Sequence, residues 1–80
     1  MSTFPIPRPE PLAVDVAFTD DSLIVRLADG RNVSAPLEWF PKLRDASPDQ
    51  RLGWRLIGRG VGIHWDALDE DISVSGLLAA

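Results

Sequence analysis

The chain has no cysteine, no tyrosine, one histidine and one methionine among its 80 residues. Without cysteine it can form neither disulfides nor thiolate metal sites, and a cysteine nucleophile is excluded. A single histidine leaves few side chains for acid–base catalysis near neutral pH. No apolar run approaches the ~20 residues that a membrane-spanning helix needs. We therefore expect no enzyme activity, no cofactor, no metal and no membrane association.

The composition is acidic, with 12 Asp and Glu residues against 8 Lys and Arg residues and a net charge of −4. This balance argues against direct nucleic-acid binding, because such proteins usually carry a basic face. The start of the chain, MSTFPIPRPEP, lacks the basic and then apolar pattern of a signal peptide. We therefore expect a cytoplasmic protein. Because the core of so small a domain is thin, we expect either a monomer or a homodimer.

Alternating prolines at the start of the chain favour an extended conformation, because they fix φ and remove backbone donors. We expect an extended arm over residues 1–11 and one compact α+β domain over residues 12–80. Within that domain, apolar and polar residues alternate over 14–19 and 23–28, and Asp29-Gly30 suits a hairpin turn. The pattern predicts an antiparallel three-stranded meander over residues 13–35.

The second half of the chain mixes short helices with a hairpin. A helical apolar face predicts a helix near 38–45, and Ser47-Pro48-Asp49-Gln50 is typical of a capped helix start. Apolar runs on either side of a glycine-rich turn predict paired strands over 54–57 and 61–65. Residues 66–71 are expected to form an acidic loop or one helical turn. Ser73 then suits the N-cap of a last short helix. The expected fold class is a small antiparallel β-sheet, an N-terminal meander plus a C-terminal hairpin, with two or three short helices.

Large aromatic residues are expected to supply the core of so small a domain. The first interpretation of Trp39, Trp54 and Trp65 is that they are core residues, and the alternative is that one of them is exposed for binding. His64 lies between apolar neighbours on a predicted strand, without a nucleophile motif, so we expect a structural role for it.

Four carboxylates near the C-terminus are the candidate partner-binding residues: Asp66, Asp69, Glu70 and Asp71. Their order does not match a calcium loop, and residues 69–71 could instead favour the N-terminus of the final helix. Three arginines spaced four apart are the alternative, as nucleic-acid contacts: Arg51, Arg55 and Arg59. The predicted strand over 54–57 would disrupt that stripe. Lys42 and Arg44 could join such a basic surface.

Two long segments resemble a bacterial family known as domain of unknown function 2442. WRLIGRGVGIHWDALDEDISVSGLLA resembles its WRLIGGGxGIHWPDLDEDISVEGLL, and LADGRNVSAPLEWFPKLRDASPDQR resembles its LxDGRxISVPLxWYPRLxxATPEER. The resemblance covers about residues 12–79. Asp66 stands where the family usually has proline, and Ser75 where it usually has glutamate.

The resemblance implies a compact α+β domain with a small antiparallel sheet and supplies no catalytic residues. Some members are linked with toxin–antitoxin-like gene pairs, and others with DNA-binding regulators. We expect a non-catalytic regulatory or inhibitory protein that uses its acidic surface to bind a protein partner with a basic surface. It could be an antitoxin-like neutraliser or a phage-type inhibitor such as an anti-CRISPR protein. The alternatives are a DNA-associated transcriptional regulator and, less well supported, a small enzyme.

Overall fold

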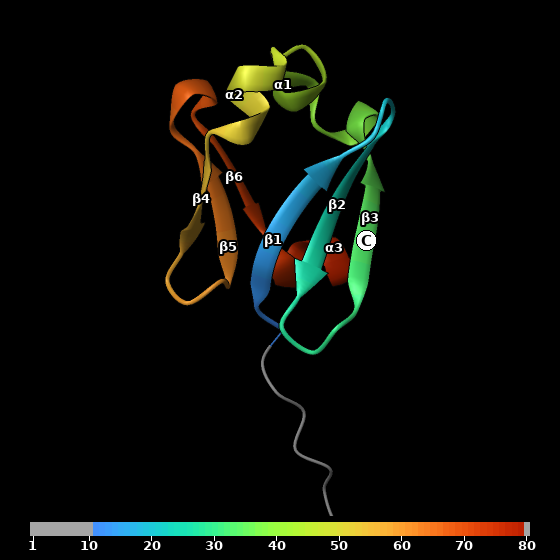
Figure 1. Ribbon diagram of the computed structural model, residues 1–80, viewed down its shortest axis with the longest axis vertical. Coiled ribbons are helices and arrows are strands. Elements are labelled where there is room, and N and C mark those ends of the chain that lie inside the picture. Colours follow the sequence, from blue (N-terminus) through green and yellow to red (C-terminus); the bar gives the residue numbers. More distant parts are fainter. Residues whose placement is uncertain (1–10, 80) are drawn as a thin grey trace, which may run out of the picture.

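Two three-stranded antiparallel sheets make up most of the protein, as the computed structural model shows (Figure 1). The structure describes residues 11–79, so the predicted arm lies outside them apart from Pro11. The first sheet has the order β1-β2-β3 and the second β4-β5-β6. Their strands are β1 (Ala13–Phe18), β2 (Ser22–Leu27), β3 (Asn32–Pro36), β4 (Trp54–Ile57), β5 (Gly62–Trp65) and β6 (Glu70–Ser73).

Short helices connect and close the sheets. They are the 3-10 turns η1 (Leu37–Trp39) and η2 (Asp66–Leu68) and the α-helices α1 (Pro41–Arg44), α2 (Pro48–Leu52) and α3 (Val74–Ala79). Helices α1 and α2 lie at one end of the two sheets, and α3 lies behind the first sheet (Figure 1). The predicted α+β class is therefore confirmed. Within residues 11–79, none of these helices is long and apolar enough to cross a membrane.

Most of the first sheet follows from its alternating sequence, although a bulge between Ala13 and Asp15 interrupts the pattern and leaves Val14 48% exposed. Leu23, Val25 and Leu27 are buried on one face of β2, while Arg26 is exposed on the other. Gly30 adopts a φ of 94° in the turn between β2 and β3, a conformation that favours glycine. The predicted meander is confirmed, with its last strand extended to Pro36.

The predicted capping of α2 is also confirmed. The Ser47 hydroxyl accepts a hydrogen bond from the Gln50 N–H at 3.1 Å, and the Gln50 side chain accepts one from the Ser47 N–H at 2.9 Å. The helix expected near 38–45 is split into η1 and α1. Pro41 disfavours a helical conformation in the residue before it, and Phe40 accordingly has φ −130° and ψ 78°.

The second sheet has one strand more than the predicted hairpin. Residues 66–71 do not form only a loop or a helical turn, because η2 ends at Leu68 and β6 begins at Glu70. Asp69 adopts a left-handed conformation, with φ 50°, and reverses the chain between the two. Ile72 then lies opposite Ile63, and burial of both side chains favours the strand.

The two sheets meet at the turn between β4 and β5. The Ala13 N–H of β1 donates to the Gly60 carbonyl at 2.7 Å, which joins the two sheets. The Val74 N–H donates to the Val61 carbonyl at 3.0 Å, which ties the start of α3 to the same turn. Gly60 has a φ of 112°, and a Cβ atom there would lie 2.4 Å from the Ala13 carbonyl oxygen. A glycine is therefore required for this close approach.

The three tryptophans have different environments. Trp65 is fully buried, and its indole N–H donates to the Arg51 carbonyl at 3.0 Å. Trp54 is partly buried against the same core. Trp39 is 56% exposed, so the prediction that it is a core residue is wrong. Leu37 and Leu43 take the buried positions in this segment, which leaves the Trp39 side chain turned outward.

Candidate functional site

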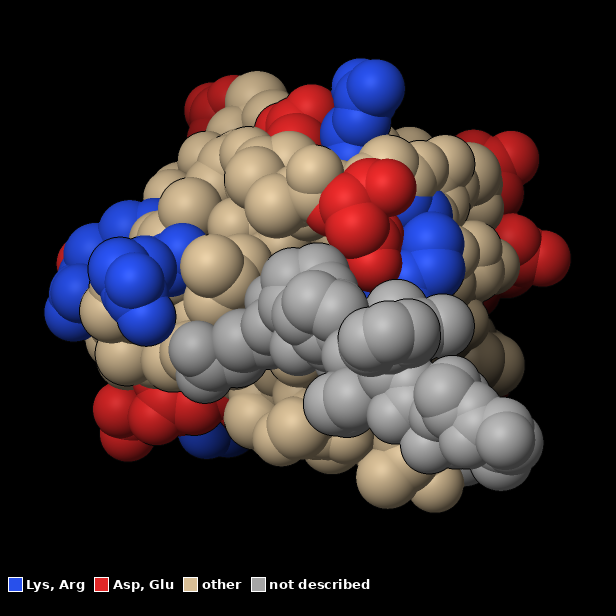
Figure 2. Space-filling model, turned by 90° about the horizontal axis from the view of Figure 1, so that it is seen from below, with Lys and Arg blue, Asp and Glu red and all other residues tan. Residues whose placement is uncertain are grey.

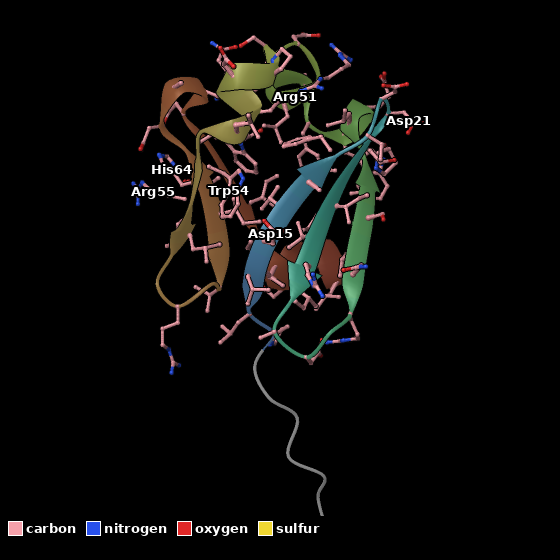
Figure 3. All side chains as sticks on the ribbon, in the orientation of Figure 1. Asp15, Asp21, Arg51, Trp54, Arg55 and His64 are labelled. Carbon is pink, nitrogen blue, oxygen red and sulfur yellow. The ribbon has the colours of Figure 1, made fainter. Side chains whose placement is uncertain are left out.

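A row of polar side chains crosses the outer face of the second sheet. The strand register places Arg55 opposite His64, and His64 opposite Asp71. Residues that lie opposite each other on antiparallel strands share one face. Arg55 and His64 both point away from the first sheet (Figure 3). Together with Asp66 from η2, these residues form what we call the sheet-face cluster.

His64 is the centre of the sheet-face cluster. Its Nε2 atom lies 2.9 Å from Asp66 Oδ1, and its Nδ1 atom contacts Asp71 Oδ1. Only 17% of the His64 side chain is exposed. Because each ring nitrogen has a carboxylate partner, the imidazole links the central strand to η2 and β6. This geometry fits the structural role that the sequence suggests for His64.

Asp66 is held in its ionised form by Arg55. The Arg55 Nε atom lies 3.2 Å from Asp66 Oδ2, and Nη2 lies 3.3 Å from Oδ1. Hydrogen bonding from this guanidinium is the main cause that lowers the pKa of Asp66 below its ordinary value of 3.8. Of the candidate partner-binding residues, Asp66 is therefore already engaged in an ion pair within the protein.

The other three candidate carboxylates lie along the entry to β6. The Asp69 carbonyl accepts a hydrogen bond from Lys42 Nζ at 3.0 Å. Glu70 is partly buried opposite Trp65, whereas the Asp71 side chain is 69% exposed. The suggestion that these charges favour the N-terminus of the last helix is wrong. Residues 70–73 pair with β5 as a strand, so α3 begins at Val74 and has no acidic residue in its first turn.

The three spaced arginines do not form a stripe. Arg51 lies on α2 and Arg55 on the outer face of β4 (Figure 3), and Arg59 lies in the turn between β4 and β5. The Arg51 guanidinium donates to the carbonyls of Leu43 at 2.9 Å and Arg44 at 2.8 Å. It also lies 5.5 Å from the centre of the Phe18 ring. Arg51 therefore fastens the end of α1 to the first sheet.

Charges of both signs are also mixed elsewhere on the surface. Arg44 lies within 3.0 Å of Asp45 and 3.3 Å of Glu38, and hydrogen bonding from Arg44 lowers the pKa of Asp45. Figure 2, viewed from the end that holds the hairpin turns, shows basic and acidic side chains interspersed around the rim. This view shows no single acidic or basic face. On this side of the molecule, net charge alone therefore does not mark a partner site.

The feature that sequence reasoning missed is an apolar groove of about 270 Å³ beside β6. It is lined by Trp39, Phe40, Asp71, Ile72, Ser73, Gly76 and Leu77. We call it the β6 groove. Its walls come from η1 and the residue after it, from the free edge of β6, and from α3. Trp39 and Asp71 are both largely exposed, so a large aromatic ring and a carboxylate line the same hollow here.

A signal for this groove is present in the sequence. Trp39 and Phe40 are adjacent and lie between Pro36 and Pro41, where only short helical turns can form. Adjacent residues on a helical turn point about 100° apart, so both rings cannot fill the same core position. One of the two aromatic residues was therefore available for the surface. That the groove would also include β6 could not be seen without predicting the strand.

A second apolar hollow, of about 380 Å³, lies between β1 and α2. It is lined by Val16, Ala17, Phe18, Pro48, Arg51 and Leu52. Leu52 is 71% exposed there. Carboxylates do not contribute to this hollow, which distinguishes it from the β6 groove. Over residues 11–79, no three His, Cys, Asp or Glu side chains are arranged to hold a metal ion.

The fold and the groove define a small α+β protein built from two linked meanders. The chain belongs to the family described as protein of unknown function (DUF2442), whose model matches residues 13–80. It is also similar to a solved protein of unknown function from Rhodospirillum rubrum ATCC 11170. The two are 35% identical, with a TM-score of 0.73, over 88% of this chain and 87% of the other. No curated protein matches this chain.

Proposed function

We propose that this protein is a non-catalytic regulatory or inhibitory protein that binds a basic surface of a protein partner at the β6 groove. The observation that carries the proposal is the 56% exposure of Trp39 in an apolar hollow that Asp71 also lines. Tryptophans in such hollows often contribute a large share of binding energy at protein interfaces. A tryptophan ring that stays exposed to water contributes little hydrophobic stabilisation to the isolated protein, whereas a partner that covers the ring would gain that stabilisation.

The charge of the surrounding residues favours a basic partner. Asp71 lines the groove, Asp69 and Glu70 directly precede it in the sequence, and the whole chain has a net charge of −4. Complementary charge speeds the encounter of two proteins and is weakened by salt. An antitoxin-like neutraliser and a phage-type inhibitor are the two forms that the proposal covers. The identity of the partner distinguishes them.

The environments of His64 and Arg51 support this proposal over its alternatives. Both ring nitrogens of His64 contact carboxylates, which leaves neither positioned to exchange a proton with a substrate. The Arg51 guanidinium is used by two backbone carbonyls, so it is poorly placed to bind a DNA phosphate. No specific observation favours an enzyme or a DNA-associated regulator.

The proposal is tested by affinity capture from the organism that carries the gene, with washes at low and high salt. The test variant carries Asp69→Lys and Asp71→Lys, and the control carries Asp20→Lys and Asp49→Lys. Both double variants change the net charge from −4 to 0, since each substitution adds two units. Circular dichroism first establishes that all three proteins are folded.

We expect one stoichiometric protein that is retained by the wild type and by the control, and lost by the test variant. It should also leave the wild type at high salt. Equal capture by both double variants would contradict the proposal. Recovery of nuclease-sensitive DNA without a protein partner would replace it with the DNA-associated alternative.

A further inference from the structure

The free edge of β6 presents backbone groups to the β6 groove. The Val74 N–H donates to the Val61 carbonyl, so these two residues form a hydrogen-bonded pair. Hydrogen-bonded and non-hydrogen-bonded pairs alternate along an antiparallel ladder. Ile72 therefore bonds Ile63, whereas the N–H and C=O groups of Asp71 and the N–H of Ser73 point away from β5. Asp71, Ile72 and Ser73 all line the groove, so the outward-pointing backbone groups of β6 lie beside it.

The other walls of the groove suit the side chains of an extended segment. Trp39 and Phe40 lie across from β6, and Leu77 and Gly76 of α3 also line the hollow. Leu77 and Ile72 are 9% and 5% exposed, so they give it a firm apolar base. In an added strand every second side chain points to the same side, so alternate residues could enter this hollow.

The charges at the groove favour a cationic side chain. The carboxylate of Asp71 is largely exposed, although one of its oxygens contacts His64. Lys42, on α1, donates its ammonium hydrogen bond to the Asp69 backbone carbonyl at 3.0 Å. This bond does not use the Asp71 carboxylate. A cation near the Trp39 ring gains a cation–π attraction, and the same cation is attracted to a neighbouring carboxylate.

We propose that the β6 groove binds an extended segment of a protein partner that contains arginine or lysine, as a fourth strand on β6. The inference rests on the proposed function and specifies how the basic partner binds. Backbone groups of Asp71 and Ser73 supply the pairing, and the Trp39 ring with the Asp71 carboxylate selects the cation. A helical partner would leave those backbone groups unused, since its own are paired internally.

The test is an NMR titration of the full ¹⁵N-labelled chain with a blocked peptide that alternates arginine and valine. One control peptide has glutamate in place of arginine. A second arginine peptide is N-methylated at two consecutive central residues, which blocks both edges of the strand. Trp39→Ala and Leu52→Ala are the matched protein variants, because both side chains are exposed but only Trp39 lines the β6 groove.

We expect the arginine peptide to shift the amide signals of Asp71 and Ser73 and to slow their hydrogen exchange. The Trp39→Ala variant and the N-methylated peptide should each weaken binding by about tenfold. The Leu52→Ala variant should bind as the wild type does, and the glutamate peptide should not bind.

Equal affinity for the N-methylated peptide, or signal shifts confined to residues away from β6, would overturn strand addition. This outcome is separate from the capture experiment, which depends on the Asp69 and Asp71 charges and on no particular backbone pairing. Loss of strand addition with intact, charge-dependent capture would leave the proposed function in place. Failure of both experiments would reject both.

Discussion

The free edges of β1 and β6 use aspartate in opposite ways. On β1 the Asp15 carboxylate accepts a hydrogen bond from the Val16 N–H at 2.9 Å, and the register shifts between Ala13 and Asp15. On β6 the Asp71 carboxylate contacts His64 on the neighbouring strand, and Asp71 lines the β6 groove at the strand's outer edge. Bulges and inward-turned charges at an edge prevent pairing with other chains. The β1 edge of the first sheet is thus blocked, at Ala13 by the Gly60 carbonyl and at Val16 by the Asp15 carboxylate, whereas the β6 edge of the second sheet remains accessible.

The largest effect is expected when the second sheet loses its anchor. Trp65→Ala removes a fully buried ring and its hydrogen bond to the Arg51 carbonyl. We expect it to lower the free energy of unfolding by about 3–5 kcal/mol. Trp39→Ala should change that free energy by less than about 0.5 kcal/mol, because its side chain is largely exposed. Urea unfolding followed by circular dichroism measures both free energies. An equal loss of unfolding free energy in the two variants would contradict the exposed position of the Trp39 side chain.

The next effect concerns the junction of the two sheets. Gly60→Ala would place a Cβ atom 2.4 Å from the Ala13 carbonyl oxygen and impose a φ of 112° on alanine. Gly30→Ala meets the same kind of strain, at φ 94°, but nothing lies within 4 Å of its Cβ atom. We expect each to be destabilised by about 1–3 kcal/mol through backbone strain, with Gly60→Ala the worse because of the added clash. Thermal unfolding of the two variants side by side checks the order.

A smaller effect should appear if the closed edge of the first sheet is opened. Asp15→Ala removes the acceptor of the Val16 N–H, at a cost of about 1 kcal/mol. Light scattering over a range of protein concentrations should then detect association through β1. Asp20→Ala, in the turn after β1, is the control and should leave the mass unchanged. A monomeric Asp15→Ala protein at all concentrations would argue against edge protection by Asp15.

The smallest effects involve exposed ion pairs on the two sheets. Arg55→Gln removes the main cause of the lowered pKa of Asp66, so that pKa should rise towards 3.8. For Asp29 the main cause is the hydrogen bond from the Arg31 backbone N–H. Arg31→Gln keeps this donor, so the pKa of Asp29 should rise less. Carboxyl ¹³C titrations of the two variants measure both changes, and a larger rise for Asp29 would contradict the assignment.

The sign of the accompanying pH dependence follows from the lowered pKa of Asp66. A carboxyl whose pKa is depressed by folding stabilises the folded state above its unfolded pKa. That contribution is lost as the pH falls through the folded pKa. The stability difference between the wild type and Arg55→Gln should therefore be present at neutral pH and shrink below about pH 4.

Local sequence rules predicted the elements that depend on neighbours along the chain. The Ser47–Gln50 capping box and the Gly30 turn form within a few residues, so their signals lie in the sequence. Strand β6 was not predicted, because the acidic residues over 66–71 are typical of a loop. Its burial rests on Ile72, whose partner Ile63 comes from another strand. Tertiary pairing, not local propensity, decides such a segment.

The candidate site was predictable only in part. The sequence identified the carboxylates of β6 but assigned Trp39 to the core, so the β6 groove was not foreseen. Two apolar leucines, Leu37 and Leu43, compete with Trp39 for the interior, and only packing decides which side chain is left outside. The carboxylate partners of His64 also depend on the strand register, which places residues 64 and 71 opposite each other.

The measurement that tests the β6 groove most directly is the affinity of the captured partner for three purified proteins: wild type, Trp39→Ala and Leu52→Ala. Isothermal titration at moderate salt would supply the dissociation constants. We expect Trp39→Ala to weaken binding by about tenfold or more and Leu52→Ala to leave it unchanged. Loss of binding with Leu52→Ala and none with Trp39→Ala would contradict this expectation and move the site to the hollow between β1 and α2.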